Sequence, residues 1–426
     1  MQLLGHVVTS RVPLSAEHLS RDLAIPDLSD PADGPHAIQL IANIAVSALE
    51  AAWNTAAARC EVRWCRGPRI VPIADNYDRL GYDPADVTRA VRYTRYVDEE
   101  RMLRSHSTAI VPPALRNLAA DRHQPADVLL ACPGISYRRD AIDWQHTGTP
   151  HQLDVWRVSK RELADPDLDE MIAVLLDALV PGLPYRCDPR MHPYTTRGRQ
   201  VDVRCDGVWV EVAECGLAHQ YVLSGAGLRG CTGLALGMGL DRLLMLRKQI
   251  PDIRLLRSAD PRIASQLLDL LPYRPVSSQP AIRRDLSIAV HSDEDDETLG
   301  DQVREALGPD ADAVEDVTIL SSTPCTDLPS PALARLGAQP EQRNLLVRVV
   351  LRRLDRTLTD AEANDLRDRI YARLHRGTAW QWASATVAWP PGRATAKGRV
   401  PASHEDWSPG RLQARPGKGR CHDLEY

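Results

Sequence analysis

The chain has 426 residues, 43% of them hydrophobic, which is enough for two domains that each bury a core of their own. Its formal net charge of −5 excludes attraction of nucleic acid by the molecule as a whole, so any such contact needs a local basic face. The start does not resemble a secretory signal and no apolar run is long enough to span a bilayer, so we expect a cytoplasmic protein that makes no membrane contact.

The first half of the chain predicts a sheet flanked by helices. Residues 1–35 are polar and punctuated by proline, and we expect an N-terminal extension there. The apolar spacing of residues 36–60 predicts an amphipathic helix, and residues 162–180 predict a second helix with acidic residues crowded into its first half. Strands and turns otherwise dominate up to about residue 240. Because their connections are hairpins rather than crossovers, we expect an antiparallel sheet.

Residues 136–158 predict a hairpin. A strand ends in Arg138 and Arg139, a polar loop containing Gly148 and Pro150 follows, and a second strand returns. Two adjacent arginines are thereby placed at the end of a strand.

Residues 231–262 predict a glycine-punctuated strand that runs directly into a helix. Gly237 and Gly239 lack Cβ atoms, so the strand and helix backbones can approach each other closely. Arg242 falls in the first helical turn, where free N–H groups and a guanidinium suit phosphate oxygens. Alone, the pattern fits equally well a simple strand-to-helix turn with a solvated Asp241–Arg242 pair.

The proline-rich stretch 271–281 marks a domain boundary. Beyond it, residues 283–290 and 345–354 predict strands, with an acidic helix-like run between them and a final helix at 362–375. This order is typical of a split βαβ sheet. The basic tail that follows is rich in Pro, Gly and Arg, and we expect it to be disordered.

The hairpin and the strand–helix junction resemble motifs 2 and 3 of class II aminoacyl-tRNA synthetases, and specifically the catalytic chain of the phenylalanyl-tRNA synthetase family. Several ordered motifs carry this resemblance over roughly residues 70–385, in the order of the single-chain organellar-type enzyme. The further matches are NYDRL (76–80), LRSHSTA (103–109), HPYT (192–195), VDV (201–203), WVEVAECGLAH (209–219), YRPVSSQPAIRRDLSIAV (273–290) and RTLTDAEANDLRDRI (356–370).

The resemblance implies an α+β fold. A class II synthetase antiparallel sheet flanked by helices would occupy residues 36–272, and a ferredoxin-like anticodon-binding domain residues 273–388. These domains would lie between the N-terminal extension and a basic tail at 389–426.

The resemblance also implies an ATP site, in which positioned cations stabilise charge on phosphate oxygens. Arg138 would hold the α-phosphate and Arg242 the γ-phosphate, as catalytic residues that offer bidentate donors and do not deprotonate. Glu211 matches the family carboxylate near Mg²⁺, a hard cation that prefers oxygen ligands. The other residues that the resemblance assigns to ATP are Asp140, Pro150, His151, Gly237 and Gly239.

A second set of residues matches the family's amino-acid pocket. An α-ammonium group needs carboxylate, amide or hydroxyl oxygens around it, and an aromatic side chain needs rings to pack against. The residues implied are His106, Thr108, Gln152, Asp154, His192, Tyr194 and Ala235. Outside this context, His106 fits equally a buried histidine bonded to backbone.

Four positions depart from the family pattern. Pro150 stands where an aromatic ring usually stacks on adenine, and it offers a flat apolar face without a π system. His192 and Tyr194 stand where the family carries phenylalanine, and their polar atoms would be unsatisfied against a bare phenyl ring. Glu214 stands where the family has a small residue. A polar-substituted aromatic substrate is therefore conceivable.

The resemblance implies a phenylalanine–tRNA ligase, which uses ATP and Mg²⁺ to activate its amino acid as an adenylate and transfers it to tRNA. Two alternatives stay open: a paralogue that activates a non-standard aromatic amino acid for specialised metabolism, and a catalytically silent tRNA-binding or regulatory protein. The sequence leaves the oligomeric state open, a monomer included.

The chain contains no phenylalanine, although it has 11 tyrosines and 9 tryptophans. A GC-rich coding bias is one explanation, because only four of the 52 basic residues are lysines. Selection is the other, because an enzyme that supplies Phe-tRNA would then be translated in full when Phe-tRNA is scarce. The nine cysteines include no CxxC pair, which favours reduced thiols over a disulfide framework or a zinc site.

Overall fold

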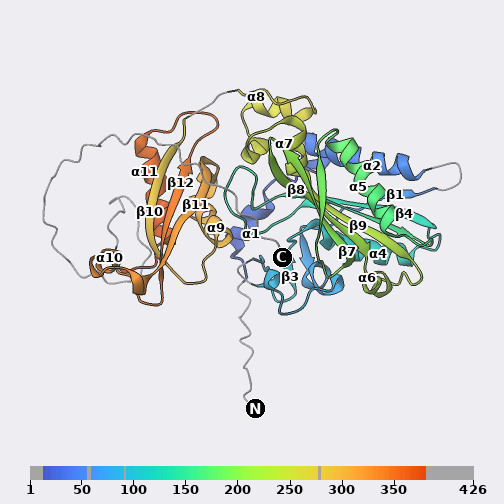
Figure 1. Ribbon diagram of the computed structural model, residues 1–426, viewed down its shortest axis with the longest axis horizontal. Helices are drawn as coiled ribbons and strands as arrows, with labels where there is room; N and C mark the ends of the chain where they lie inside the picture. Colours follow the sequence, from blue (N-terminus) through green and yellow to red (C-terminus); the bar gives the residue numbers. More distant parts are fainter. Residues whose placement is uncertain (1–12, 55–58, 91–92, 277–279, 380–426) are drawn as a thin grey trace, which may run out of the picture. The chain divides into compact units, whose positions relative to one another are not determined.

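The computed structural model describes residues 13–54, 59–90, 93–276 and 280–379, and its largest element is a seven-stranded sheet (Figure 1). The strand order is β1-β4-β5-β9-β8-β7-β6, and all neighbours are antiparallel except β1 and β4, which are parallel. The expectation of a wholly antiparallel sheet was wrong for this one pair, because a long connection rather than a hairpin joins its strands. The strands are β1 (Glu61–Trp64), β4 (Asp127–Ile135), β5 (His151–Ser159), β6 (Tyr185–Pro189), β7 (Thr195–Cys205), β8 (Val208–Ala218) and β9 (Thr232–Gly239).

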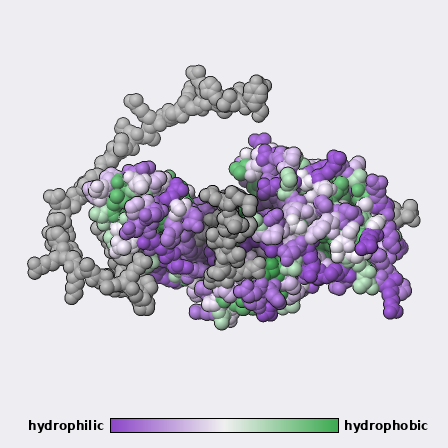
Figure 2. Space-filling model, turned by 90° about the horizontal axis from the view of Figure 1, so that it is seen from below, coloured by the Kyte–Doolittle hydropathy of each residue, from purple (hydrophilic) through white to green (hydrophobic). Residues whose placement is uncertain are grey.

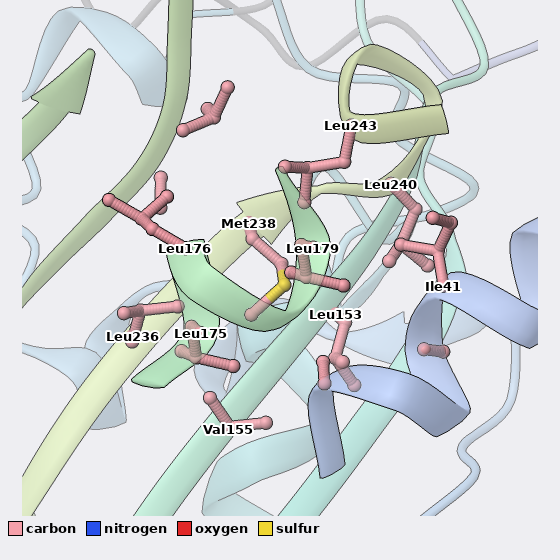
Figure 3. Close-up of a cluster of buried hydrophobic side chains, with 14 of the residues drawn as sticks. Ile41, Leu153, Val155, Leu175, Leu176, Leu179, Leu236, Met238, Leu240 and Leu243 are labelled. Carbon is pink, nitrogen blue, oxygen red and sulfur yellow. The ribbon is translucent and has the colours of Figure 1, made fainter. Parts of the chain in front are cut away.

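Three helices cover one face of this sheet: α2 (Ala37–Trp53), α5 (Asp165–Leu179) and α7 (Leu240–Lys248). Both helices predicted in the first half of the chain are confirmed as α2 and α5. Figure 3 shows side chains from these helices pointing toward side chains of β5 and β9 in one apolar cluster. The residues labelled there are Ile41, Leu153, Val155, Leu175, Leu176, Leu179, Leu236, Met238, Leu240 and Leu243.

The opposite face of the sheet is only partly covered by helices. There α4 (Val111–Ala120) and α6 (Gln220–Gly225) pack on Leu130 and Trp156 in a smaller core. A two-stranded sheet, β2 (Ile70–Pro72) with β3 (Arg101–Leu103), and helix α3 (Ile73–Asn76) precede α4 in the chain. The rest of this face carries the candidate site described below.

The N-terminal residues that the structure describes pack beside the end of strand β4 of the seven-stranded sheet. Helix α1 (Ala16–Leu23) begins at Ser15, whose side chain accepts a hydrogen bond from the N–H of His18. Leu23 and Ile25 contact a cluster formed by Leu103, Ile135 and Tyr137. The boundary that we predicted at residue 35 stays a prediction.

The C-terminal part has its own three-stranded sheet and its own core. Strand order β10-β12-β11 places β12 between two strands that are joined through α9, which confirms the predicted split βαβ arrangement. The tail at 389–426 lies outside the described residues. The elements are β10 (Ile282–Val290), α9 (Asp296–Leu307), β11 (Val314–Pro324), α10 (Ser330–Leu336), β12 (Arg343–Leu351) and α11 (Asp360–Leu374), preceded by the short α8 (Pro261–Ala264).

Hydrophilic residues dominate the face of the molecule drawn in Figure 2, and hydrophobic ones are scattered over it in small groups. Isolated exposed apolar side chains such as Trp144 and Leu271 are ordinary on a folded surface. Among the helices of the described residues, none has the length and apolar character that crossing a membrane requires.

Two adjacent residues of α2 provide a test of the packing in Figure 3. Ile41 is 1% exposed and Leu40 is 36% exposed, so the two side chains differ in burial on one helix. We expect Ile41→Ala to lower the free energy of unfolding by about 2–5 kcal/mol, through lost burial and the cavity left behind. Leu40→Ala should change it by about 0.5 kcal/mol or less. Urea unfolding followed by circular dichroism measures both; equal effects would contradict the assigned face of α2.

Candidate active site

The residue period of strand β5 separates an apolar face from a polar one. Leu153 and Val155 point into the helix-covered core, so Gln152, Asp154 and Trp156 lie on the opposite face. All three belong to the segment that follows Pro150 and His151 in the sequence. The strand therefore brings one amide, one carboxylate and one aromatic ring to the same side of the sheet.

The register across three strands places two carboxylates on either side of a glycine. Gly237 of β9 is the partner of Asp154 on β5 and of Glu214 on β8. Strands in a sheet lie about 4.8 Å apart, so the backbones of Asp154 and Glu214 are separated by about 10 Å. We call Asp154, Gly237 and Glu214 the acidic row. The next row of the same face is Trp156, Ala235 and Gly216.

Gly237 and Gly239 have no side chains, so they leave space above this face of the sheet. A Cβ atom on Gly237 would lie 3.5 Å from Oδ1 of Asp154, and one on Gly239 would meet no atom within 4 Å. Both glycines are partly exposed, whereas Ala235 is 1% exposed. A larger residue at position 237 would therefore stand between the two carboxylates of the acidic row.

Asp154 is held by the 3₁₀ turn Ser107–Ile110. The hydroxyl of Ser107 donates a hydrogen bond to Asp154, and the N–H of Ser107 donates to Oε1 of Gln152 at 3.1 Å. Asp154 is 3% exposed, and burial raises its pKa to about 6, although hydrogen bonds from Ser107 and Thr108 oppose the rise. The carboxylate is thus ionised at neutral pH at some energetic cost, which a bound cation would relieve.

His106 precedes that turn and has one nitrogen available. Burial lowers its pKa to about 4, so the ring is neutral at pH 7. Nε2 lies 3.4 Å from Nδ2 of Asn76, whereas the buried Nδ1 has no hydrogen-bond partner among the described residues. An unpaired buried nitrogen beside Asp154's turn is suited to a polar ligand.

Aromatic rings form a wall beside the acidic row. Tyr82 stacks on His106 with ring centroids 5.9 Å apart, and it lies 6.3 Å from Tyr194. Tyr194 stacks on Trp156 at 6.1 Å and lies 5.4 Å from His192. Such spacings are those of favourable ring–ring contacts, and they suit packing against another aromatic ring. The predicted pocket residues His106, Thr108, Gln152, Asp154, His192, Tyr194 and Ala235 are therefore gathered on one face of the sheet.

Glu214 contacts one histidine and one arginine. Nε2 of His192 lies 2.8 Å from Oε2 of Glu214, and Nε of Arg190 donates to Oε1 at 3.1 Å. Burial acts to raise the pKa of Glu214, but the hydrogen bond from His192 and the charges of His192 and Arg190 outweigh it and hold the pKa below its usual value. Glu214 is therefore ionised at neutral pH.

Arg138 and Asp140 form an ion pair on the loop after β4. Nε of Arg138 donates to Oδ2 of Asp140 at 2.9 Å, and the Arg138 N–H donates to the carbonyl of Gly148 at 3.1 Å across the loop. The Arg138 side chain is 38% exposed and Asp140 is buried, so the guanidinium is oriented while part of it stays accessible. The charge of Arg138 also acts on the His106 ring.

Arg242 and Glu211 meet at the start of α7. Nη1 of Arg242 donates to the carbonyl of Glu211 at 3.1 Å and lies 3.9 Å from its carboxylate. Burial raises the pKa of Glu211, and the nearby charge of Glu214 adds to the rise. Two neighbouring carboxylates favour a cation between or beside them. Among the described residues, no group of three His, Cys, Asp or Glu side chains is placed to bind a metal ion.

The structure places Pro150 and His151 in the interior. Pro150 is buried, and its carbonyl accepts a hydrogen bond from the N–H of Ser136 at 2.8 Å. His151 is 0% exposed: Nδ1 lies 2.9 Å from Oδ1 of Asp241, and Nε2 lies 3.1 Å from the N–H of Leu28 and 3.0 Å from Nη2 of Arg257. Neither side chain presents an open face for a nucleotide in this structure. His151 instead ties β5 to α7 and to the N-terminal segment.

Four residues of the site were not identified from the sequence: Ser107, Trp156, Tyr82 and Arg190. Trp156 has a sequence signal, because it continues the alternation of Gln152 and Asp154. Ser107 lies inside the LRSHSTA motif, but its bond to a residue 47 positions later is not visible in the sequence. Tyr82 and Arg190 lie in connections whose paths only the folded chain reveals.

Comparison with known proteins places all these residues in one matched region. The model of the family described as tRNA synthetases class II core domain (F) matches residues 54–267. The phenylalanine–tRNA ligase alpha subunit of Nostoc punctiforme is 30% identical over 60% of this chain and 73% of its own length. The chloroplastic/mitochondrial phenylalanine–tRNA ligase of Arabidopsis thaliana is 28% identical over 71% of this chain and 68% of its own length. Every candidate site residue, from Tyr82 to Arg242, lies within the matched range.

The raised pKa of Asp154 predicts a stability difference that depends on pH. A carboxyl whose pKa is higher in the folded than in the unfolded chain binds its proton more tightly when folded, so it destabilises the fold progressively from about pH 4 to pH 6. Asp154→Asn cannot ionise. We expect the stability of this variant relative to wild type to increase by up to about 3 kcal/mol over that window and then to level off.

Urea unfolding of both proteins at pH 4.5, 5.5, 6.5 and 8 measures this difference. Glu170→Gln, at an exposed position of α5, is the control and should show no such window. A difference that stays constant with pH would show that Asp154 titrates near its ordinary value.

Proposed function

Because the chain belongs to the class II aminoacyl-tRNA synthetases of the phenylalanine type, we propose that it activates an aromatic amino acid with ATP and transfers it to tRNA. The observation that carries the proposal is the position of Asp154 on the acidic row, held by Ser107 and bordered by aromatic rings. A carboxylate for an ammonium group beside rings for a side chain is the arrangement that an aromatic amino acid needs.

Asp154 would bind the α-ammonium group of the substrate. Its ionised form is costly in the buried site, and an ammonium ion relieves that cost by direct pairing. Gln152 and Nδ1 of His106 would provide further polar contacts, because both lie beside the same turn. The ring of the substrate would pack against Tyr194 over the row that contains Trp156 and Ala235. These contacts fix which end of the amino acid faces the nucleotide.

Arg138 and Arg242 would bind the phosphates of ATP. Adenylate formation joins a carboxylate oxygen of the amino acid to the α-phosphorus and releases pyrophosphate, so negative charge redistributes over phosphate oxygens. Fixed guanidinium groups stabilise that charge without reorganising at the moment of reaction. Arg138 is already oriented by Asp140 and Arg242 by the carbonyl of Glu211. When bound, Mg²⁺ would neutralise phosphate charge, and Glu211 is the residue that fits it.

For the transfer step, the C-terminal three-stranded sheet would bind the tRNA. One face of that sheet packs on α9 and α11, and Asp285, Arg348 and Thr318 pair side by side on the other. A polar sheet face with arginines is compatible with a nucleic-acid backbone or bases. The cationic groups at Arg138 and Arg242 favour an active synthetase over the catalytically silent alternative.

Arg242 offers a direct test of the ATP site. We expect Arg242→Ala to lower amino-acid-dependent ATP–pyrophosphate exchange by about 100-fold or more, because it removes one preorganised donor to a charged transition state. The fold should persist, since the Arg242 side chain is partly exposed and donates to a backbone carbonyl, that of Glu211. Arg247→Ala, in the last turn of the same helix, is the matched control and should keep wild-type exchange. Exchange near the wild-type rate in Arg242→Ala would show that the ATP phosphates bind elsewhere.

A further inference from the structure

The far end of the acidic row from Asp154 carries a charged pair inside the aromatic wall. His192 and Glu214 are in contact at 2.8 Å, and their side chains are 11% and 27% exposed. Tyr194 touches His192 and Trp156, so this pair stands beside the rings against which a substrate ring would pack. An unsubstituted phenyl ring at this end would displace water from the Glu214 carboxylate without replacing the lost hydrogen bonds.

The Glu214 carboxylate lies near the aromatic wall, and it can accept more hydrogen bonds than it does. Burial is the main cause that raises the pKa of Tyr194 and of Tyr82, and the charge of Glu214 adds to both shifts. The geometric link is His192, which lies 2.8 Å from Glu214 and whose ring centroid lies 5.4 Å from that of Tyr194. An ionised carboxylate offers about four lone-pair positions, and in the described residues two are used, by Arg190 and by His192. Both tyrosine hydroxyls stay protonated at neutral pH. The carboxylate is thus an acceptor that a donor on the ligand can use.

A purely structural role for this cluster is the alternative. Arg190 and His192 lie between β6 and β7, and their contacts with Glu214 on β8 tie that connection to the sheet. The ion pair of the exposed Arg190 with Glu214 is sufficient to hold this connection against the sheet. Such a tie does not require His192, and its carboxylate need not lie on the row that ends at Asp154. The two roles differ in one measurable respect: a structural defect weakens all substrates alike, whereas a recognition defect changes their ratio.

We propose that the substrate is an aromatic amino acid whose ring carries a hydrogen-bond donor, a hydroxyl or an amino group, that donates to Glu214. This inference rests on the proposed function, and it names the substrate class of the same site. Laid along the acidic row, such a molecule places its ammonium group at Asp154 and its ring substituent at Glu214, over Gly237. A hydrogen bond to a charged group contributes enough to favour the donor-bearing ring over phenylalanine by about 10- to 100-fold in kcat/KM.

The test compares phenylalanine, tyrosine, meta-tyrosine and 4-aminophenylalanine in ATP–pyrophosphate exchange with the full chain. We expect at least one of the three substituted amino acids to exceed phenylalanine by about tenfold or more in kcat/KM. Glu214→Gln and Glu214→Ala should each reduce that ratio to about threefold or less, the first while preserving side-chain shape. Glu170→Gln should leave the ratio unchanged. Thermal unfolding of each variant confirms that it is folded.

Phenylalanine used best, with a ratio that neither Glu214 variant changes, would overturn the inference and leave the proposed function standing. Exchange with no amino acid at all would overturn the proposed function instead. In that event, calorimetric titration of the same four amino acids without ATP reads the ring preference directly. A donor preference in binding that is lost in Glu214→Gln supports the inference, and equal or absent binding of all four overturns it.

Discussion

The two-residue period of strands β5 and β9, and of residues 213–217 of β8, is the constraint on which the rest of the structure depends. One side of these strands must be apolar, because α2, α5 and α7 pack on Leu153, Val155, Leu236 and Met238. The other side is then free to carry Asp154 and Glu214 without placing them in the core. A shift of one residue in the register of β5 would exchange the two sets, burying a carboxylate against helices and exposing leucine. The packing in Figure 3 thus fixes the site as firmly as it fixes the fold.

The two buried carboxylates of this region, Asp241 and Asp154, differ in whether a positively charged group lies beside them. Asp241 is buried against His151, and its pKa is lowered because hydrogen bonds and the charge of His151 outweigh burial. Asp154 has hydroxyl donors but no buried cation in hydrogen-bond contact among the described residues, and its pKa is raised to about 6. This difference supports the role that we propose for Asp154, the binding of a cationic group of the substrate. Functional sites commonly retain such locally unfavourable groups, and the surrounding core offsets their cost.

The sequence predicts the long elements well and the long-range contacts poorly. The helices α2, α5 and α11 and the strand–helix junction at β9 and α7 follow from periodicity and from glycine positions. The parallel β1–β4 pair escaped prediction because strand pairing across a long connection leaves no local pattern. His151 illustrates the same limit: its place in a motif indicates a ligand site, yet its ring is occupied by Asp241, Leu28 and Arg257, which are distant in sequence. The acidic row likewise needs a register that only the folded sheet supplies.

The residues that stand in place of phenylalanine differ between the core and the site. Core positions are filled by other large side chains in place of phenylalanine: Leu234 and Leu236 are fully apolar, and the Tyr77 hydroxyl is satisfied by Thr94 at 2.7 Å. Replacements of this kind keep volume and leave no polar atom unpaired. Base composition can account for them, since it acts on codons without regard to contacts. It does not account for His192, which contacts a carboxylate at a position where the family has a small residue. The substrate class that we propose accounts for this pair, because a ring that carries a hydrogen-bond donor needs an acceptor such as Glu214 at this end of the acidic row.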